Sequence, residues 1–335
     1  MTSERVRRWR RELRRAVGGA LNVATARVMN RRRGPPAAPV LDLAGYRRLV
    51  APTPRDMADL LAWRSNRERA RLTEAVLRLA GLPVDRRPYR TVEGAGVNLF
   101  VDVGAGPRTL VLAAHHDAVP GSPGANDNAA AVGILRALGA RLAADPPRRL
   151  RVRLGFFGGE ERAMLGSRVY VRRGAPDQIL KDLVGVVSLE LCGIGDSLAL
   201  WDVTPALEGT PLVRTFTAAV EALGYRRDAS YHLAEPVPFF GSDHRPFVDR
   251  GVPGAGLTMV PRASMEPLRA FIYGGVRGIL IPPARRPPPF TTYHTARDAP
   301  ETLEPPTLAA VEQVLEVFVR TLDAGPPPTS RGRPV

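Results

Sequence analysis

Acidic and histidine side chains recur where apolar runs of this sequence end. They are His115, Asp117, Asp127, Glu160, Glu161, Glu190 and His294. Carboxylates and imidazoles together are ligands that zinc takes in catalytic sites, and Asp127, with two oxygens, can bridge a pair of ions roughly 3.5 Å apart. Adjacent Glu160 and Glu161 point different ways from one backbone turn, so one can bind metal while the other acts as a base. The residue types therefore predict a zinc centre.

Each of these features also has a purely structural explanation. A Glu-Glu pair is commonly a solvated turn, and the run Asn126-Asp127-Asn128 can cap a helix. His115 could be a core histidine and His116 a surface one. Their shared position at strand ends favours the metal site, because unpaired carboxylates are costly in a buried context.

The elements that must position these residues follow from hydrophobic periodicity. Apolar runs predict strands at 97–103, 109–114, 150–157, 183–191 and 254–259, and helical spacing predicts helices at 54–81, 126–142, 163–171, 211–223 and 308–322. Strands that alternate with helices imply a sheet covered on both faces, with functional groups at the carboxyl ends of the strands. We expect a three-layer α/β/α sandwich with a mixed, mostly parallel central sheet.

Loops rich in glycine and proline separate these elements. Gly104-Ala-Gly-Pro107 is typical of a hairpin turn between the strands on either side of it. The proline-rich stretch 281–290 cannot be an interior strand, because successive prolines remove backbone donors. We expect it to be a loop at the mouth of the site.

Composition and charge divide the chain into three parts. At 335 residues with 44% hydrophobic residues, it can bury a sizeable core. We predict a basic, Arg-rich leader and Pro linker at 1–39, one globular domain at 40–324 and a disordered tail at 325–335. In the leader, Val6, Trp9, Leu13, Val17, Ala20, Ala24 and Val28 recur at helical spacing, so it is either a solvated, partly ordered segment or a basic amphipathic helix.

The net charge of +15 is concentrated before residue 34. Because this charge lies in a short terminal segment and is not spread along a face, we expect no nucleic-acid partner. A weak contact of residues 1–33 with an anionic membrane surface stays open as an alternative. Cys192 alone excludes an intramolecular disulfide and fits the cytoplasm. The alternative is export, because paired arginines precede a weakly apolar stretch and Ala24-Thr-Ala26. No run is long and apolar enough to predict a membrane-spanning helix.

Ordered sequence blocks over roughly residues 85–322 resemble the co-catalytic dizinc aminopeptidases, whose relatives include glutamate carboxypeptidases and glutaminyl cyclases. The blocks are Ala114-His-His-Asp117, Pro123-Gly-Ala-Asn-Asp-Asn128, Phe157-Gly-Gly-Glu-Glu161 with Leu165-Gly-Ser-Arg168, Ser188-Leu-Glu-Leu191, Ser242-Asp-His244 with Phe247, and Tyr293-His-Thr295 with Asp298. The resemblance implies a zinc exopeptidase fold, two zinc ions and a peptide or aminoacyl substrate.

The resemblance also assigns roles to individual residues. It makes His115 and Glu190 ligands of one zinc, Glu161 and His294 ligands of the other, and Asp127 the bridge. Glu160 becomes the general base that takes a proton from a metal-activated water, and Asp117 the acceptor that holds the His115 imidazole. It further implies a cis peptide bond between Asp127 and Asn128. Pocket residues around the ligands are Asn128, Ser242, Asp243, His244 and Tyr293, with Phe240 as a further wall.

Glu190 departs from the pattern, because the family usually has Asp there. A carboxylate one methylene longer can reach zinc, but it can bind in a different mode or weaken that site. The expected function is removal of an N-terminal residue from peptides. Two alternatives stay open: a glutaminyl cyclase, which needs one zinc and no hydrolytic water, and a catalytically idle protein of the same fold used for binding or anchoring.

Overall fold

The computed structural model describes residues 17–30, 40–174, 180–238, 240–275, 278 and 281–325. The described part of the chain contains no helix that is both long enough and apolar enough to cross a membrane. The predicted tail lies outside the described residues from 326 on, as does the linker at 31–39. The limits of the predicted leader, domain and tail therefore stay predictions.

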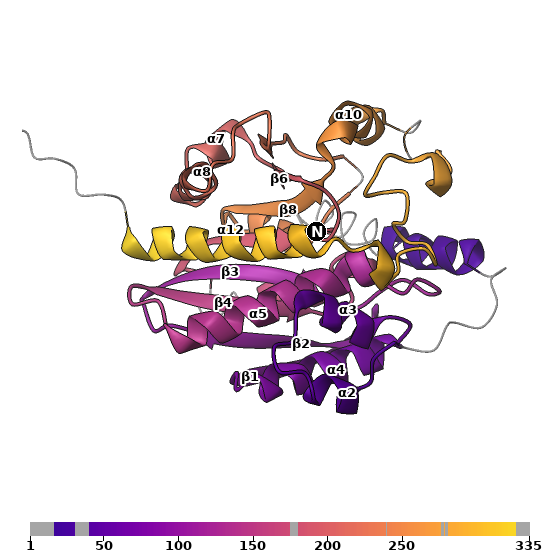
Figure 1. The fold of residues 1–335 in the computed structure, drawn as a ribbon, viewed down its shortest axis with the longest axis horizontal. Coiled ribbons are helices and arrows are strands. Elements are labelled where there is room, and N and C mark those ends of the chain that lie inside the picture. Colours follow the sequence, from indigo (N-terminus) through magenta and orange to yellow (C-terminus); the bar gives the residue numbers. More distant parts are fainter. Residues whose placement is uncertain are drawn as a thin grey trace, which may run out of the picture.

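A single eight-stranded sheet forms the centre of the fold, in the order β1-β2-β4-β3-β5-β8-β6-β7 (Figure 1). The strands are β1 (Val84–Thr91), β2 (Gly94–Val103), β3 (Arg108–His115), β4 (Leu150–Phe157), β5 (Leu183–Leu189), β6 (Ser197–Trp201), β7 (Tyr231–Leu233) and β8 (Gly254–Val260). The central strands β4, β3, β5 and β8 run parallel, whereas β1, β2 and β6 add antiparallel pairings. The predicted mixed, mostly parallel sheet is confirmed.

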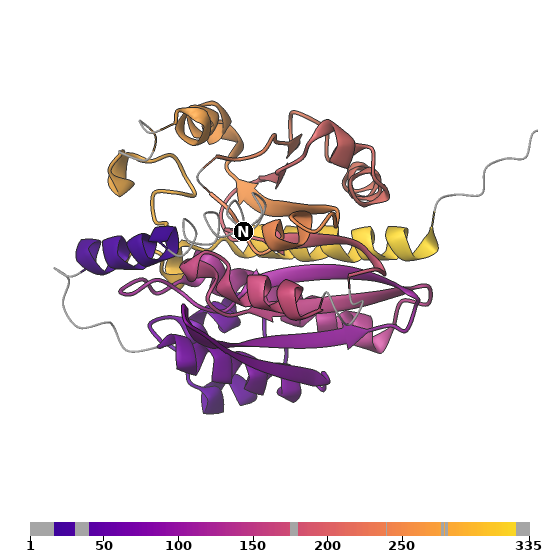
Figure 2. The ribbon, with the colours of Figure 1, turned by 180° about the vertical axis from the view of Figure 1, so that it is seen from behind.

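Helices cover both faces of the sheet. The longer ones are α3 (Pro54–Leu61), α4 (Asn66–Leu79), α5 (Ala130–Ala144), α6 (Leu165–Gly174), α8 (Pro211–Ala222), α10 (Met265–Tyr273) and α12 (Pro305–Ala324), and the short ones are α2 (Leu43–Arg47), α7 (Pro205–Glu208) and α9 (Arg245–Val248). Figure 1 shows α5 and α12 side by side on the face turned to the viewer, and Figure 2 shows the opposite face. The three-layer sandwich is therefore as predicted.

The alternation of side chains along β3 explains these layers. Leu110, Leu112 and Ala114 belong to the large core cluster beneath α3, α5, α8 and α12. Val111 and Ala113 point the other way, into a second cluster with residues of α6 and α9. Because successive strand residues face opposite sides, the middle of β3 is apolar on both faces, and polar residues occur only towards its two ends. The carboxyl end is the one that faces the loops of the candidate site. That end is His115.

The predicted hairpin at 104–107 is wrong. Strands β2 and β3 do not pair with each other, because β4 lies between them and pairs with both. The hairpin is instead formed by β1 and β2, whose register ends at the pair Thr91 and Gly94. Strand β1 was not predicted, because it is polar and contains Pro88, a residue that a strand tolerates at the edge of a sheet.

The single helix predicted at 54–81 is two helices. Helix α3 ends at Leu61, Trp63 has a positive φ of 62°, and Ser65 begins α4. The Ser65 hydroxyl accepts from the Glu68 amide while the Glu68 carboxylate accepts from the Ser65 amide. This reciprocal capping box starts a new helix, and its Ser-x-x-Glu pattern is visible in the sequence. Strands β6 and β7 and helix α10 were not predicted.

Residues 17–29 of the predicted leader form a helix that contacts the domain. Val17 and Val28, which belong to the predicted apolar stripe, are 50% and 66% exposed, whereas Ala26 is 1% exposed. The face that meets the domain is therefore not the predicted apolar one. In Figures 1 and 2 this indigo helix lies at one end of the molecule, beside the loops that follow the central strands.

A buried arginine of α4 fixes the loops at the carboxyl end of β3. Arg69 is 0% exposed, and its guanidinium donates to the carbonyl oxygens of Leu61, His116, Pro123 and Gly124 at 2.6–3.1 Å. Burial lowers the pKa of Arg69 to about 10, opposed by the charges of Asp117, Asp298 and other acids nearby. Arg69 therefore stays protonated. It holds both ends of the loop at 116–124 against the end of α3.

Replacing Arg69 should destabilise the protein as a whole. In Arg69→Met the carbonyl oxygens that it serves lose their donor, at about 1–3 kcal/mol for each one left unpaired. We expect the free energy of unfolding to fall by about 3 kcal/mol or more, measured by urea denaturation. Arg71→Met, an exposed arginine of the same helix, is the matched control and should differ little from wild type. Equal unfolding free energies for the two variants would contradict this role.

Candidate metal centre

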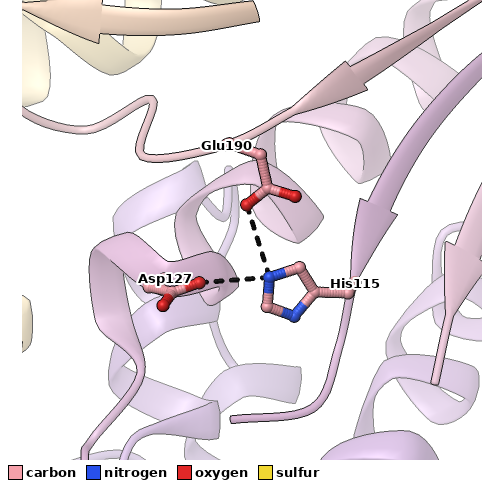
Figure 3. Close-up of side chains that lie close together, drawn as sticks. All are labelled: His115, Asp127 and Glu190. Atoms are coloured by element: carbon pink, nitrogen blue, oxygen red, sulfur yellow. Dashed lines mark ion pairs between the residues drawn. The ribbon is translucent and has the colours of Figure 1, made fainter. Parts of the chain in front are cut away.

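The first cluster of candidate ligands joins three segments of the chain (Figure 3). His115 ends β3, Asp127 lies on the turn Ala125–Ala129 before α5, and Glu190 follows β5. The His115 Nε2 atom is 3.1 Å from Asp127 Oδ1 and 3.4 Å from Glu190 Oε2. The predicted ligand set of one ion is therefore brought together, and Glu190 reaches it despite its extra methylene.

The second cluster shares Asp127. The His294 Nε2 atom lies 3.3 Å from Asp127 Oδ2 and 3.0 Å from Glu161 Oε2. In each cluster the ligand atoms lie within 4.8 Å of one another. The two oxygens of Asp127 thus face different histidines, one in each cluster, which is the arrangement a bridging carboxylate requires.

The buried nitrogen and oxygen atoms of the two clusters suit a pair of divalent cations. His294 Nε2 and Glu161 Oε1 are buried and have no hydrogen-bond partner within the described ranges, although carboxylates surround them. Buried polar atoms normally have partners, and a cation between nitrogen and oxygen atoms would supply one. His115 offers Nε2 to the cluster while its Nδ1 lies 3.1 Å from the Asp117 carbonyl oxygen, so a proton on Nδ1 leaves Nε2 free to bind metal.

The electrostatics of the two clusters show the same need for positive charge. Although burial opposes protonation, Glu161 and Asp127 raise the pKa of His294 to about 10. Burial raises the pKa of Glu161 and Glu190 above the usual range for a carboxyl, and the nearby Asp127 adds to this effect. The clusters therefore favour added positive charge, which a pair of cations would supply.

Asp298 fixes the bridging residue. Its carboxylate accepts from the amide of Asn126 at 2.8 Å and from that of Asp127 at 3.1 Å. The peptide bond between Asp127 and Asn128 is cis, as the resemblance implied. Asp298 had been noted only as part of a sequence block, and its contact with the Asp127 backbone could not be predicted from the spacing alone.

Ser242 and Asn128 orient Glu190. The Ser242 hydroxyl donates to Glu190 Oε1 at 2.5 Å, and the Asn128 amide donates to Glu190 Oε2 at 3.2 Å. Asn128 also donates to the Leu189 carbonyl oxygen at 2.7 Å. Both residues had been predicted to lie around the ligands, and they hold the one carboxylate that departs from the family pattern.

Asp117 lies beneath the Glu160–Glu161 turn. Its carboxylate accepts from the Glu160 amide at 3.1 Å and from the Glu161 amide at 3.3 Å. Its Oδ1 atom is 3.6 Å from His115 Nδ1, which places the carboxylate next to the imidazole but at a longer distance than the Asp117 carbonyl oxygen. Asp117 therefore contacts a residue of each cluster.

The other predicted pocket residues divide into two groups. Tyr293 stacks on His294, with ring centroids 3.7 Å apart, and lines the cavity together with Phe240. Asp243 and His244 instead contact residues away from the two clusters. Asp243 accepts from Ser167 of α6 at 2.5 Å, and His244 Nε2 is 2.9 Å from Asp202. His244 thus shares Asp202 with Arg245, and its assignment to the surroundings of the ligands stays a prediction.

A cavity of about 490 Å³ opens beside the clusters. Asp127, Glu160 and Glu190 form part of its lining. The remaining wall is mainly apolar and includes Leu191, Val260, Leu268, Ile272 and Phe290. Phe290 belongs to the proline-rich loop at 281–290, so that loop does border the site. His232 also lines the cavity.

The ordered blocks and both clusters belong to one family pattern. A family model described as peptidase family M28 matches residues 98–319, more than half of the chain. The chain belongs to peptidase family M28. The matched range begins within β2 and ends within α12, so it contains every candidate ligand.

Curated relatives in this family resemble the chain over part of their length. Leupeptin-inactivating enzyme 1 of Streptomyces exfoliatus is 25% identical over 254 residues, which cover 74% of this chain and 53% of that protein. Aminopeptidase YwaD of Bacillus subtilis is 29% identical over 151 residues, which cover 44% of this chain and 31% of that protein. The chain therefore spans about half or less of these relatives.

Solved structures show the same fold at low identity. A zinc aminopeptidase from Bacillus subtilis superposes with a TM-score of 0.55 at 22% identity, covering 69% of this chain and 51% of that chain. A glutaminyl cyclase from Porphyromonas gingivalis superposes with a TM-score of 0.60 at 16% identity, covering 81% and 97%. Both a peptidase and a cyclase thus share the fold.

The shared position of Asp127 predicts unequal effects of ligand replacement. Asp127→Ala should weaken the binding of both cations, whereas His294→Ala should weaken mainly one, each by at least about 100-fold since a ligand itself is lost. Zinc titration into metal-free protein measures both affinities. His232→Ala, a histidine that lines the cavity outside the clusters, is the control and should bind as wild type does. Equal losses of both ions in His294→Ala would contradict the bridging arrangement.

Proposed function

We propose that the chain is a zinc-dependent aminopeptidase that removes an N-terminal residue from peptides. The observation that carries this proposal is the position of Asp127 between two histidines, one on each of its oxygens. Two complete clusters around one carboxylate suit a pair of zinc ions. The zinc aminopeptidase of Bacillus subtilis, with the same fold, supports the choice of metal.

Glu160 is the proposed general base. It lines the cavity together with Asp127 and Glu190, and the turn that carries it is fixed by Asp117. Burial raises the pKa of Glu160 well above its usual value, and the charges of Glu190 and Glu161 add to this effect. A carboxylate with raised proton affinity can accept the proton of the attacking water and hand it to the leaving amine.

Zinc, when bound, would polarise the scissile carbonyl and make the attacking water more acidic. The chain itself supplies the positions of the reacting groups. Ser242 and Asn128 fix Glu190, Asp298 fixes Asp127, and Asp117 fixes the Glu160 backbone. These contacts hold the proton acceptor and the ligands in one geometry, which is how a site reduces the cost of orienting its reactants.

The apolar wall of the cavity supports a peptide or aminoacyl substrate with a hydrophobic N-terminal side chain. Val260, Leu268 and Phe290 would contact that side chain. The carbonyl group of the scissile peptide bond would then lie near Asp127 and Glu160. The chain spans about half of Leupeptin-inactivating enzyme 1, so the proposed substrate class rests on the cavity wall and not on the substrates of that relative. We propose no nucleic-acid partner.

We retain the cytoplasm as the proposed compartment, since Cys192 is a buried free thiol. Export remains the alternative, and one relative, from Mycobacterium tuberculosis, is named a probable lipoprotein aminopeptidase. Fractionation of cells that produce the chain, with an intact-mass measurement of its N-terminus, distinguishes the two.

The second candidate function is that of a glutaminyl cyclase, which the structural similarity to the Porphyromonas gingivalis enzyme favours. A cyclase needs a single zinc and no hydrolytic water. The two clusters that share Asp127 favour the peptidase. Incubation with a peptide that begins with glutamine separates them, because a cyclase releases ammonia and keeps the peptide whole, whereas an aminopeptidase releases the first residue.

Glu160→Gln tests the proposed mechanism. The amide cannot accept the proton, so kcat for aminoacyl fluorogenic substrates should fall by about 10²–10⁴-fold. Zinc content should stay at the wild-type value, because Glu160 belongs to neither cluster of candidate ligands. Glu266→Gln, an exposed glutamate on α10, is the control and should keep full activity. Activity retained in Glu160→Gln would show that another group takes the proton.

A further inference from the structure

The helix at 17–29 touches the second cluster of candidate ligands. The Asn22 side-chain amide donates to Glu161 Oε2 at 3.1 Å and to the Glu161 carbonyl oxygen at 3.3 Å. The Asn30 side-chain amide, at the end of the same helix, donates to the carbonyl oxygens of Pro120 at 3.0 Å and His294 at 3.2 Å. Glu161 and His294 are the two ligands that belong to this cluster alone.

One stripe of the helix makes these contacts. Gly19, Asn22, Ala26 and Asn30 recur at intervals of three or four residues, so they share one face. A Cβ atom on Gly19 would lie 2.7 Å from the backbone of Arg162, the residue after Glu161, so only glycine permits this approach. Ala26 is 1% exposed. The side chains on this face are therefore small or polar where the helix meets the domain.

The direction of the Asn22 hydrogen bond determines its effect. Glu161 Oε2 is the oxygen that lies 3.0 Å from His294 Nε2, and it receives the Asn22 proton as well. A donor on the ligating carboxylate fixes its rotamer and favours its charged form. Glu161 Oε1 has no hydrogen-bond partner among the described residues. The amide of Asn22 therefore orients the carboxylate while one oxygen stays free for a cation.

The two clusters thus differ in what orients them. Glu190 of the first cluster is held by Ser242 and Asn128, both inside the domain. In the second cluster, the backbone amide of Glu161 donates to the Asp117 carboxylate, and the Glu161 carboxylate accepts from the Asn22 side chain. Among the residues that the structure describes, the N-terminal helix at 17–29 therefore contacts the second cluster through Glu161.

We propose that Asn22 is a positioning residue for the second metal ion, so that the helix at 17–29 is a structural part of the dimetal site and sets the affinity of that ion. The proposal rests on the proposed dizinc centre. In this view the basic segment that carries the helix acts on the site itself. Its exposed side, which includes Val17, Leu21 and Val28, takes no part in the contact.

Metal binding by full-length variants tests this proposal without any catalytic assay. In Asn22→Ala and in Asn22→Leu, which keeps the side-chain volume but loses the donor, the second ion should bind about 10–100-fold more weakly. The first ion should bind as in wild type. Zinc affinities come from calorimetric titration of metal-free protein, and stepwise loading with Co²⁺ gives a separate absorption signature for each site. Thr25→Ala, an exposed residue of the same helix, is the matched control and should leave both affinities unchanged.

Each other outcome overturns the proposal in a recognisable way. Unchanged second-site affinity in both Asn22 variants would show that the contact has no effect on the ion. An equal loss at both sites, or the same loss in Thr25→Ala, would show that the helix acts only through general stability. If wild-type protein itself takes up fewer than two ions, the dizinc centre fails first, and the inference fails with it.

Discussion

The accumulation of negative charge in a buried space is the constraint on which the rest of the structure depends. Asp127, Glu161 and Glu190 lie within two overlapping clusters, and Asp117 and Asp298 are buried beside them. Isolated carboxylates would not remain ionised in such surroundings without nearby positive charge. His115, His294 and Arg69 supply part of that charge, and a pair of cations would supply the remainder. The loops that carry Asp127 and Glu160 are therefore fixed by hydrogen bonds to charged side chains.

The parallel strands explain how the clusters arise from distant segments. Strands β3 and β5 are hydrogen-bonded neighbours, so their carboxyl ends place His115 and Glu190 side by side. The register of β3 with β4 sets Phe157 opposite His115, and the turn that follows β4 carries Glu160 and Glu161. His294 comes from a loop far along the chain and reaches the same point. Apolar strands fix the positions, and the polar residues at their ends and in the loops beyond form the two clusters of candidate ligands.

The sequence predicted the ligands and the central strands because both depend on local patterns. Strand β4 was predicted with its observed bounds, and His115, Asp127, Glu161, Glu190 and His294 are brought together as expected. Pairing partners were harder, because nothing local to Gly104 and Pro107 indicates that β4 inserts between β2 and β3. Arg69 was also missed. Its pattern is that of any arginine on an amphipathic helix, and only the fold shows that backbone carbonyls surround it.

The helix at 17–29 shows why hydrophobic periodicity misplaced the contact face. Periodicity selects the face with the most apolar side chains, which here contains Val17 and Val28, both largely exposed. The contact with the domain is made through Gly19 and Asn22, because close approach to Arg162 needs a missing Cβ and Glu161 needs a donor. A carboxylate that must remain charged is served better by an amide than by a valine. The close approach at Gly19 and the hydrogen bond from Asn22 to Glu161 therefore determine which face of the helix meets the domain.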